Sequence, residues 1–160
     1  MTGARVVAID DNVIAEARRS SIDLEPHPGG TGVLAVRIAR NKCYRGRLNF
    51  VAAHGQGPVS WVTVTGNRLE GMALGIDVED RAGGRRQNWT VLDNTSTLPS
   101  GNPRGSTMRF WRVDGVVVRG NTQPMKPNRS MFLAGLDDVT AAIVEDNELG
   151  PNAAGQWKNL

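Results

Sequence analysis

Six short segments that each end in asparagine recur at nearly constant intervals along the chain. Successive asparagines are separated by 29, 26, 27, 27 and 26 residues. The segments are "VVAIDDN" ending at Asn12, "AVRIARN" at Asn41, "VTVTGN" at Asn67, "WTVLDN" at Asn94, "VVVRGN" at Asn121 and "AIVEDN" at Asn147. A fixed period of this size indicates one structural unit that is repeated and stacked.

Each asparagine follows a short strand in which side chains alternate between two faces. The positions five and three residues before it are apolar in all six copies, so both columns are expected to face the core. They are Val7, Val36, Val62, Trp89, Val116 and Ala142, and Ile9, Ile38, Val64, Val91, Val118 and Val144. A second strand follows the first five asparagines, with inward columns expected at Ile22, Leu48, Ile76, Met108 and Met131 and at Leu24, Phe50, Val78, Phe110 and Leu133.

Two strands with their turns in one such period form a coil of a solenoid, where each coil buries its apolar rows only against its neighbours. No helical pattern separates the strands, which argues against alternating strands and helices. The asparagines are expected to adopt left-handed geometry at a bend and to form a ladder of amide hydrogen bonds along the axis. Two positions further on, a third inward strand is expected at Ile14, Cys43, Leu69, Ser96, Gln123 and Leu149. Cys43 is then a buried small side chain rather than a nucleophile.

The asparagine-terminated strand at this period, together with "SIDLEP" at 21–26, resembles the right-handed parallel β-helix proteins of the pectate lyase-like superfamily. The resemblance covers residues 5 to 150, and implies an all-β chain with a single right-handed parallel β-helix of about six coils. It also implies a function in recognising or cleaving a polysaccharide, as a lyase or glycoside hydrolase. The superfamily includes viral tailspikes and adhesins, so the alternative is a structural or adhesive module of a viral tail or cell-surface fibre.

Acidic side chains are expected to gather on the outer face of the second strands. Equivalent residues on adjacent coils lie about 4.8 Å apart in a parallel stack. The outward columns are predicted to be Asp23, Asn49, Asp77, Arg109 and Phe132, and Glu25, Val51, Glu79, Trp111 and Ala134. Asp23 and Asp77 would then be roughly 9 to 10 Å apart, near the upper end of the separation between an acid and a base in inverting glycosidases.

On this hypothesis Asp77 or Glu79 is the general acid, and Asp23 or Glu25 is the base. Arg109 would neutralise an anionic group of the substrate. Further binding residues are predicted at Asn49 and His54 by position, and at Trp111 and Phe132 as stacking platforms for sugar rings. The chain lacks the Asn-Thr-Asp, Gly-His-Gly and Arg-Ile-Lys stretches expected of polygalacturonase-like hydrolases.

Two other interpretations of the acidic face stay open. It can be a noncatalytic glycan-binding or ion-binding face, or a plain solvated or interface surface, because outward strand positions are normally polar. His54 can be a turn residue. No metal ligand set is assigned; closely placed carboxylates suit calcium, yet Glu25 and Glu79 are too far apart to share one ion.

Composition limits the partners. A net charge of +3 without a dense basic run argues against nucleic acid, and no apolar stretch is long enough for a membrane span. No signal peptide precedes the first strand, and a lone cysteine leaves the compartment undetermined.

No N-terminal cap is evident. We therefore expect either that the chain is a fragment of a longer solenoid, or that another subunit of a homo-oligomer covers Val6 to Ile9. In the C-terminal tail, 150–160, Trp157 is expected either to fold over the last coil or to anchor a partner.

Overall fold

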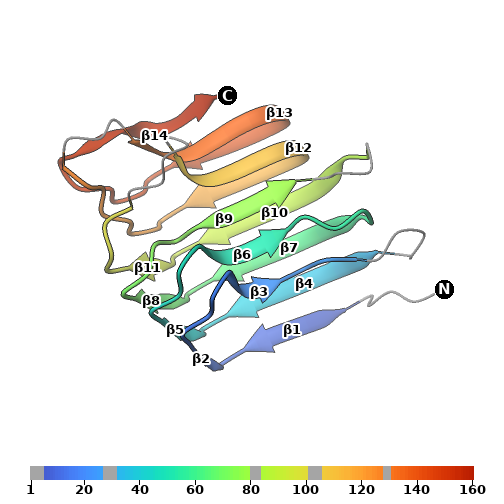
Figure 1. Cartoon of the computed structure of the whole chain (residues 1–160). Coiled ribbons are helices and arrows are strands. Elements are labelled where there is room, and N and C mark those ends of the chain that lie inside the picture. The colour runs from blue at the N-terminus through green and yellow to red at the C-terminus, as the bar shows by residue number, and fades with distance from the viewer. Residues whose placement is uncertain (1–5, 27–31, 80–83, 101–105, 128–130) are drawn as a thin grey trace.

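The computed structural model describes residues 6–26, 32–79, 84–100, 106–127 and 131–160, which fold as an all-β parallel solenoid of about five turns (Figure 1). The predicted solenoid is confirmed, with about five turns in place of about six. The difference arises because six recurring asparagines bound only five complete turns. None of the described segments forms a helix long and apolar enough to cross a membrane.

The first sheet is formed by the strands that precede the asparagines. It contains β1 (Val7–Asp10), β4 (Val33–Ala39), β7 (Val59–Thr65), β10 (Arg86–Leu92) and the C-terminal parts of β12 (Ser106–Arg119) and β13 (Met131–Glu145), all parallel. The predicted alignment of both columns is confirmed along its whole length: Val7 pairs with Val36, and Val118 with Val144. The predicted burial holds except at Ala142 on the last strand of this sheet, which is exposed. The repeated alternation therefore specifies this sheet from sequence alone.

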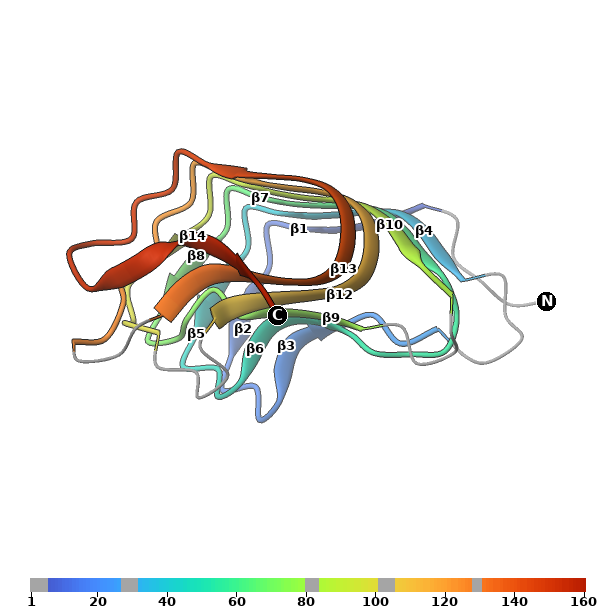
Figure 2. The same cartoon turned by 90° about the horizontal axis from the view of Figure 1, so that it is seen from above.

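The second sheet is formed by β3 (Ser20–Asp23), β6 (Asn49–Ala53), β9 (Ile76–Glu79), the N-terminal parts of β12 and β13, and β14 (Ala153–Asn159). Seen along the axis, β12 and β13 curve from one sheet into the other (Figure 2). The predicted third strand is a small sheet of β2 (Val13–Ala15), β5 (Lys42–Tyr44), β8 (Arg68–Glu70) and β11 (Thr95–Ser96). The C-terminal tail supplies β14, which pairs with β13 and extends the second sheet by one strand.

The predicted alignment of the second strands is wrong in two coils. Ile22 and Ile76 pair with Val51, not with Leu48, which is 65% exposed. Phe50 and Val51 both donate backbone hydrogen bonds to the carbonyl of Gly75, at 2.7 and 3.1 Å. This double donation is a bulge, which turns two successive side chains inward and shifts the following residues.

The second shift lies in β13. Met108 pairs with Ala134, whereas the prediction aligned it with Met131. Met131 and Leu133 are nevertheless buried, so their predicted inward orientation is confirmed although their partners differ. An irregularity in the pairing of β13 with β14 lies at Met131 and Phe132.

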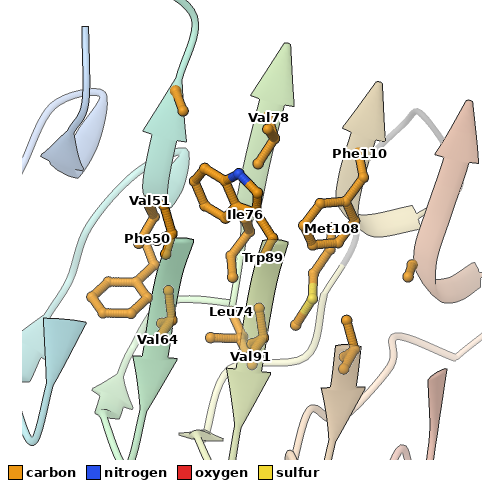
Figure 3. Packing of buried hydrophobic residues seen from close by; sticks show 14 of the residues in the cluster. Phe50, Val51, Val64, Leu74, Ile76, Val78, Trp89, Val91, Met108 and Phe110 are labelled. Atoms are coloured by element: carbon orange, nitrogen blue, oxygen red, sulfur yellow. The ribbon is translucent and has the colours of Figure 1, made fainter. Parts of the chain in front are cut away.

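The core is a row of apolar side chains that runs along the axis between the sheets (Figure 3). Trp89 and Phe110, from opposite sheets, meet edge to face with ring centroids 6.4 Å apart. Cys43 is fully buried, as predicted, and burial raises the pKa of its thiol to about 11. At the N-terminal end, no described strand lies beyond β1, and Val6 and Val13 are 81% and 71% exposed.

The predicted asparagine ladder is present, but its asparagines are not left-handed. The positive φ angles belong to the residue directly before each asparagine: Asp11 at 58°, Arg40 at 53°, Gly66 at 61°, Asp93 at 54°, Gly120 at 67° and Asp146 at 54°. Because the preceding residue makes the bend, each asparagine side chain can lie along the axis and bond to the next. Gln156 Oε1 accepts from Asn147 Nδ2 at 2.9 Å and ends the ladder.

Candidate functional site

The outer face of the second sheet carries most of the predicted site residues. Its first outward column is Asp23, Ala52, Asp77, Arg109, Gly135 and Lys158. Asp23 and Asp77 are thus two strands apart, as predicted, which corresponds to roughly 9 to 10 Å. The residue between them is Ala52 and not Asn49, which pairs with Ser20.

Two further members of the predicted columns are misplaced. Phe132 pairs with Ser106 and is not beside Arg109, and Val51 is buried in the core. In the second outward column Glu79 pairs with Trp111, which pairs with Asp137 and not with Ala134. These misplacements follow from the two pairing shifts of three residues. In β6 the shift also turns Val51 inward, whereas Met131 and Leu133 of β13 stay buried.

His54 and Asp77 form the central contact of this face. The distance from His54 Nε2 to Asp77 Oδ2 is 3.2 Å, and the side chains are only 20% and 13% exposed. Ala52 points outward between Asp23 and Asp77 yet is 2% exposed, so the larger side chains around it cover it. Asp77 pairs with Ala52, and His54 follows two residues after Ala52, so the contact joins β9 to the end of the adjacent strand β6.

Asp23 lies at the edge of the same group. Burial raises the pKa of its carboxyl above the usual value, and the negative charge of Glu25 raises it further. The charges of His54 and Arg19 act in the opposite direction and offset part of this shift. The raised pKa means that Asp23 keeps its proton to a higher pH than an ordinary aspartate does.

Arg109 is engaged by its own neighbours. Its Nη1 lies 4.0 Å from Glu79 Oε2, and its guanidinium lies 5.7 Å from the centre of the Trp111 ring. Lys158 Nζ similarly lies 5.8 Å from the centre of the Phe132 ring. Each predicted stacking platform thus already has a cation over its ring.

A groove of about 560 Å³ opens beside the His54–Asp77 pair. Among the predicted residues it is lined by Asn49, His54 and Asp77, and not by Asp23, Glu25, Glu79, Arg109, Trp111 or Phe132. The other polar side chains that line it are Arg47, Ser100, Thr107 and Lys126. These four come from turns and strand starts, which the repeat does not align, so only their position before the second strands could have indicated them.

Metal binding gains no geometric basis on this face. Across the residues that the structure describes, no group of three or more His, Cys, Asp or Glu side chains could hold a metal ion. Asp77, the predicted carboxylate that lines the groove, contacts His54.

Comparison of the chain with models of protein families, with curated proteins and with solved structures finds no match.

Proposed function

We propose that this solenoid binds an acidic polysaccharide in the groove beside His54 and Asp77. The observation that carries the proposal is that one groove of about 560 Å³ brings together two cations, Arg47 and Lys126, and the His54–Asp77 pair. Cations suit the carboxylate or sulfate groups of such a chain, while the amide, imidazole and hydroxyl groups suit its hydroxyls.

The repeating surface supports a polymeric ligand. Neighbouring strands of the second sheet are about 4.8 Å apart. A polysaccharide that lies across them would therefore contact equivalent backbone groups at regular intervals. The resemblance of the repeat to pectate lyase-like proteins points to the same class of ligand. Arg47 and Lys126 are exposed, so they are available to charged groups of a ligand.

Cleavage of the bound chain is a second candidate function, favoured by the placement of Asp23 and Asp77. They lie two strands apart, roughly 9 to 10 Å, with a histidine close to Asp77. This separation leaves room for a water between substrate and base, as in inverting hydrolysis. Asp23, whose pKa is raised, would donate the proton to the leaving oxygen, and Asp77 would activate the water.

Binding is tested by calorimetric titration with oligogalacturonate, alginate oligomers and hyaluronan oligomers. We expect at least one to bind, and Arg47→Ala with Lys126→Ala to weaken it about tenfold or more, because each charge-assisted contact contributes about 1.5–3 kcal/mol. Asp146→Asn is the matched control, because its side chain is 76% exposed near Arg119, outside the groove.

Reducing-end release separates recognition from cleavage. If the chain cleaves its ligand, Asp23→Asn should abolish release while binding is kept. Binding without release by the wild type leaves recognition alone. If a folded wild type binds none of the three acidic oligomers, the proposal is wrong, and the alternative of a structural or adhesive module is favoured.

A further inference from the structure

A column of left-handed residues crosses the middle of the first sheet, opposite the groove. Its members are Ala35, Trp61, Asn88, Gly115 and Ala141, with φ of 54°, 59°, 54°, 80° and 54°. Pairing of the flanking residues places them at one level on successive strands. The backbone conformation thus recurs on the five successive strands β4, β7, β10, β12 and β13, whereas the side chain differs from strand to strand.

Trp61 stands out in this column. A bulky side chain is disfavoured in the left-handed region, and alanine occupies the same position in two other coils. The indole gives no core packing in return, because Trp61 is 62% exposed. A strained, exposed aromatic residue with no packing role points to a role in binding.

A cleft of about 340 Å³ lies beside Trp61. It is hollow because Gly115 of β12 and Ala141 of β13, two strands that pair with each other, carry little or no side chain. Trp61 and Ile143 contribute exposed apolar surface, and Asn88 adds a polar amide. Of the described residues that line this cleft, none carries a charged side chain.

We propose that the cleft binds a neutral sugar ring, stacked on Trp61 and hydrogen-bonded through Asn88 and the hydroxyls of Thr63 and Thr90. The volume lies at the small end of ligand sites, roughly 300–1,000 Å³, which fits one or two rings. An aromatic face with a few convergent polar groups matches the apolar face and polar rim of a pyranose. The inference goes beyond the groove and does not rest on it, because the site lies on the other sheet and its described lining is uncharged.

The test is titration with methyl glycosides of glucose, galactose, mannose and N-acetylglucosamine and with neutral trisaccharides of these sugars, followed by calorimetry. We expect wild type to bind at least one, Trp61→Ala to weaken it about tenfold or more, and Trp61→Phe to weaken it less. Trp61→Ala should fold normally, since Ala35 and Ala141 already adopt this conformation. Trp157→Ala, an exposed tryptophan on β14, is the matched control and should bind as wild type does.

Two further arms separate this site from the groove and from self-association. Asp77→Asn should leave neutral-sugar binding unchanged, and Trp61→Ala should leave binding of acidic oligomers unchanged. The proposal is overturned if folded wild type binds no neutral sugar, or if Trp61→Ala binds it equally well. It is also overturned if light scattering shows a dimer that Trp61→Ala converts to monomer, because the cleft is then covered by a second copy.

Discussion

The backbone N–H and the side-chain Nδ2 of Asn67 both donate to Oδ1 of Asn94, at 3.0 and 2.8 Å. Asn94 makes the same pair of bonds to Asn121 in the next coil. Each amide oxygen thus holds two donors of the coil before it, in a buried position without competing water. The ladder therefore joins neighbouring coils by polar contacts as well as by apolar packing.

Replacing Asn67 by alanine should lower the free energy of unfolding by about 3 kcal/mol or more, because several buried partners lose a hydrogen bond. The groups affected include the backbone N–H of Asn41 and Oδ1 of Asn94. Asn12→Ala is the matched control at the exposed end of the ladder and should lower it by about 1 kcal/mol or less. Urea denaturation followed by circular dichroism measures both, and equal losses would contradict a structural role for the ladder.

Asp114 should make the stability of the folded protein depend on pH under acidic conditions. Thr140 donates a hydrogen bond to its Oδ1 at 2.6 Å and Arg85 lies at 2.7 Å, so the folded protein holds the pKa of Asp114 below the ordinary value of about 3.9. A lowered pKa contributes stability that is present above the ordinary value and is lost as pH falls toward the folded value. The denaturation midpoint of Asp114→Asn should therefore lie below that of wild type at pH 7. The difference between the two midpoints should become smaller below about pH 4. Midpoints that differ by the same amount at every pH would contradict this prediction.

Asp23→Asn should have the opposite sign. Burial and Glu25 raise the pKa of Asp23 in the folded protein, so the contribution of Asp23 is present below the ordinary value and is lost as pH rises through the folded pKa. Asparagine is uncharged at every pH, so the Asp23→Asn variant does not lose this stability as pH rises. Melting curves should show the variant equal to wild type near pH 3 and more stable at pH 7. A less stable variant at pH 7 would show that the carboxylate is stabilised by its surroundings.

Cys43 should resist thiol reagents in the folded protein. It is fully buried, and its pKa is raised to about 11, so the thiolate fraction at pH 8 is about two orders of magnitude below that of a free cysteine. Labelling with Ellman's reagent should be slow in buffer and rapid in urea. Rapid labelling without urea would mean that the coil around Cys43 opens readily.

Most of the fold could be predicted because the repeat links two physical requirements in every coil. Val36 and Ile38 must face the core, and Asn41 must follow them at a fixed distance to reach its equivalents. The bend residue was predicted wrongly, since asparagine and the residue before it both suit such a turn. Here the conformation falls on the preceding residue, which frees the amide for the ladder.

The second sheet was predicted less well because turns of different length precede its strands. Apolar residues around 48–53 allow more than one alignment, and the bulge at Phe50 and Val51 decides between them. Of the predicted site, Asp23 and Asp77 keep their relation, while Asn49 and Phe132 lose theirs. Arg47, Lys126 and the cleft beside Trp61 could not be found this way, because cavities depend on several coils at once.

By itself, the sequence determined a stack of parallel coils with a buried amide ladder, because residues in fixed positions of a repeat must meet their equivalents when the coils pile up. Tertiary structure alone decided that His54 meets Asp77 of the adjacent strand, and that Trp61 borders a cleft. The reason is that contacts between different positions of different coils depend on turn lengths, bulges and the size of neighbouring side chains, which no single repeat contains.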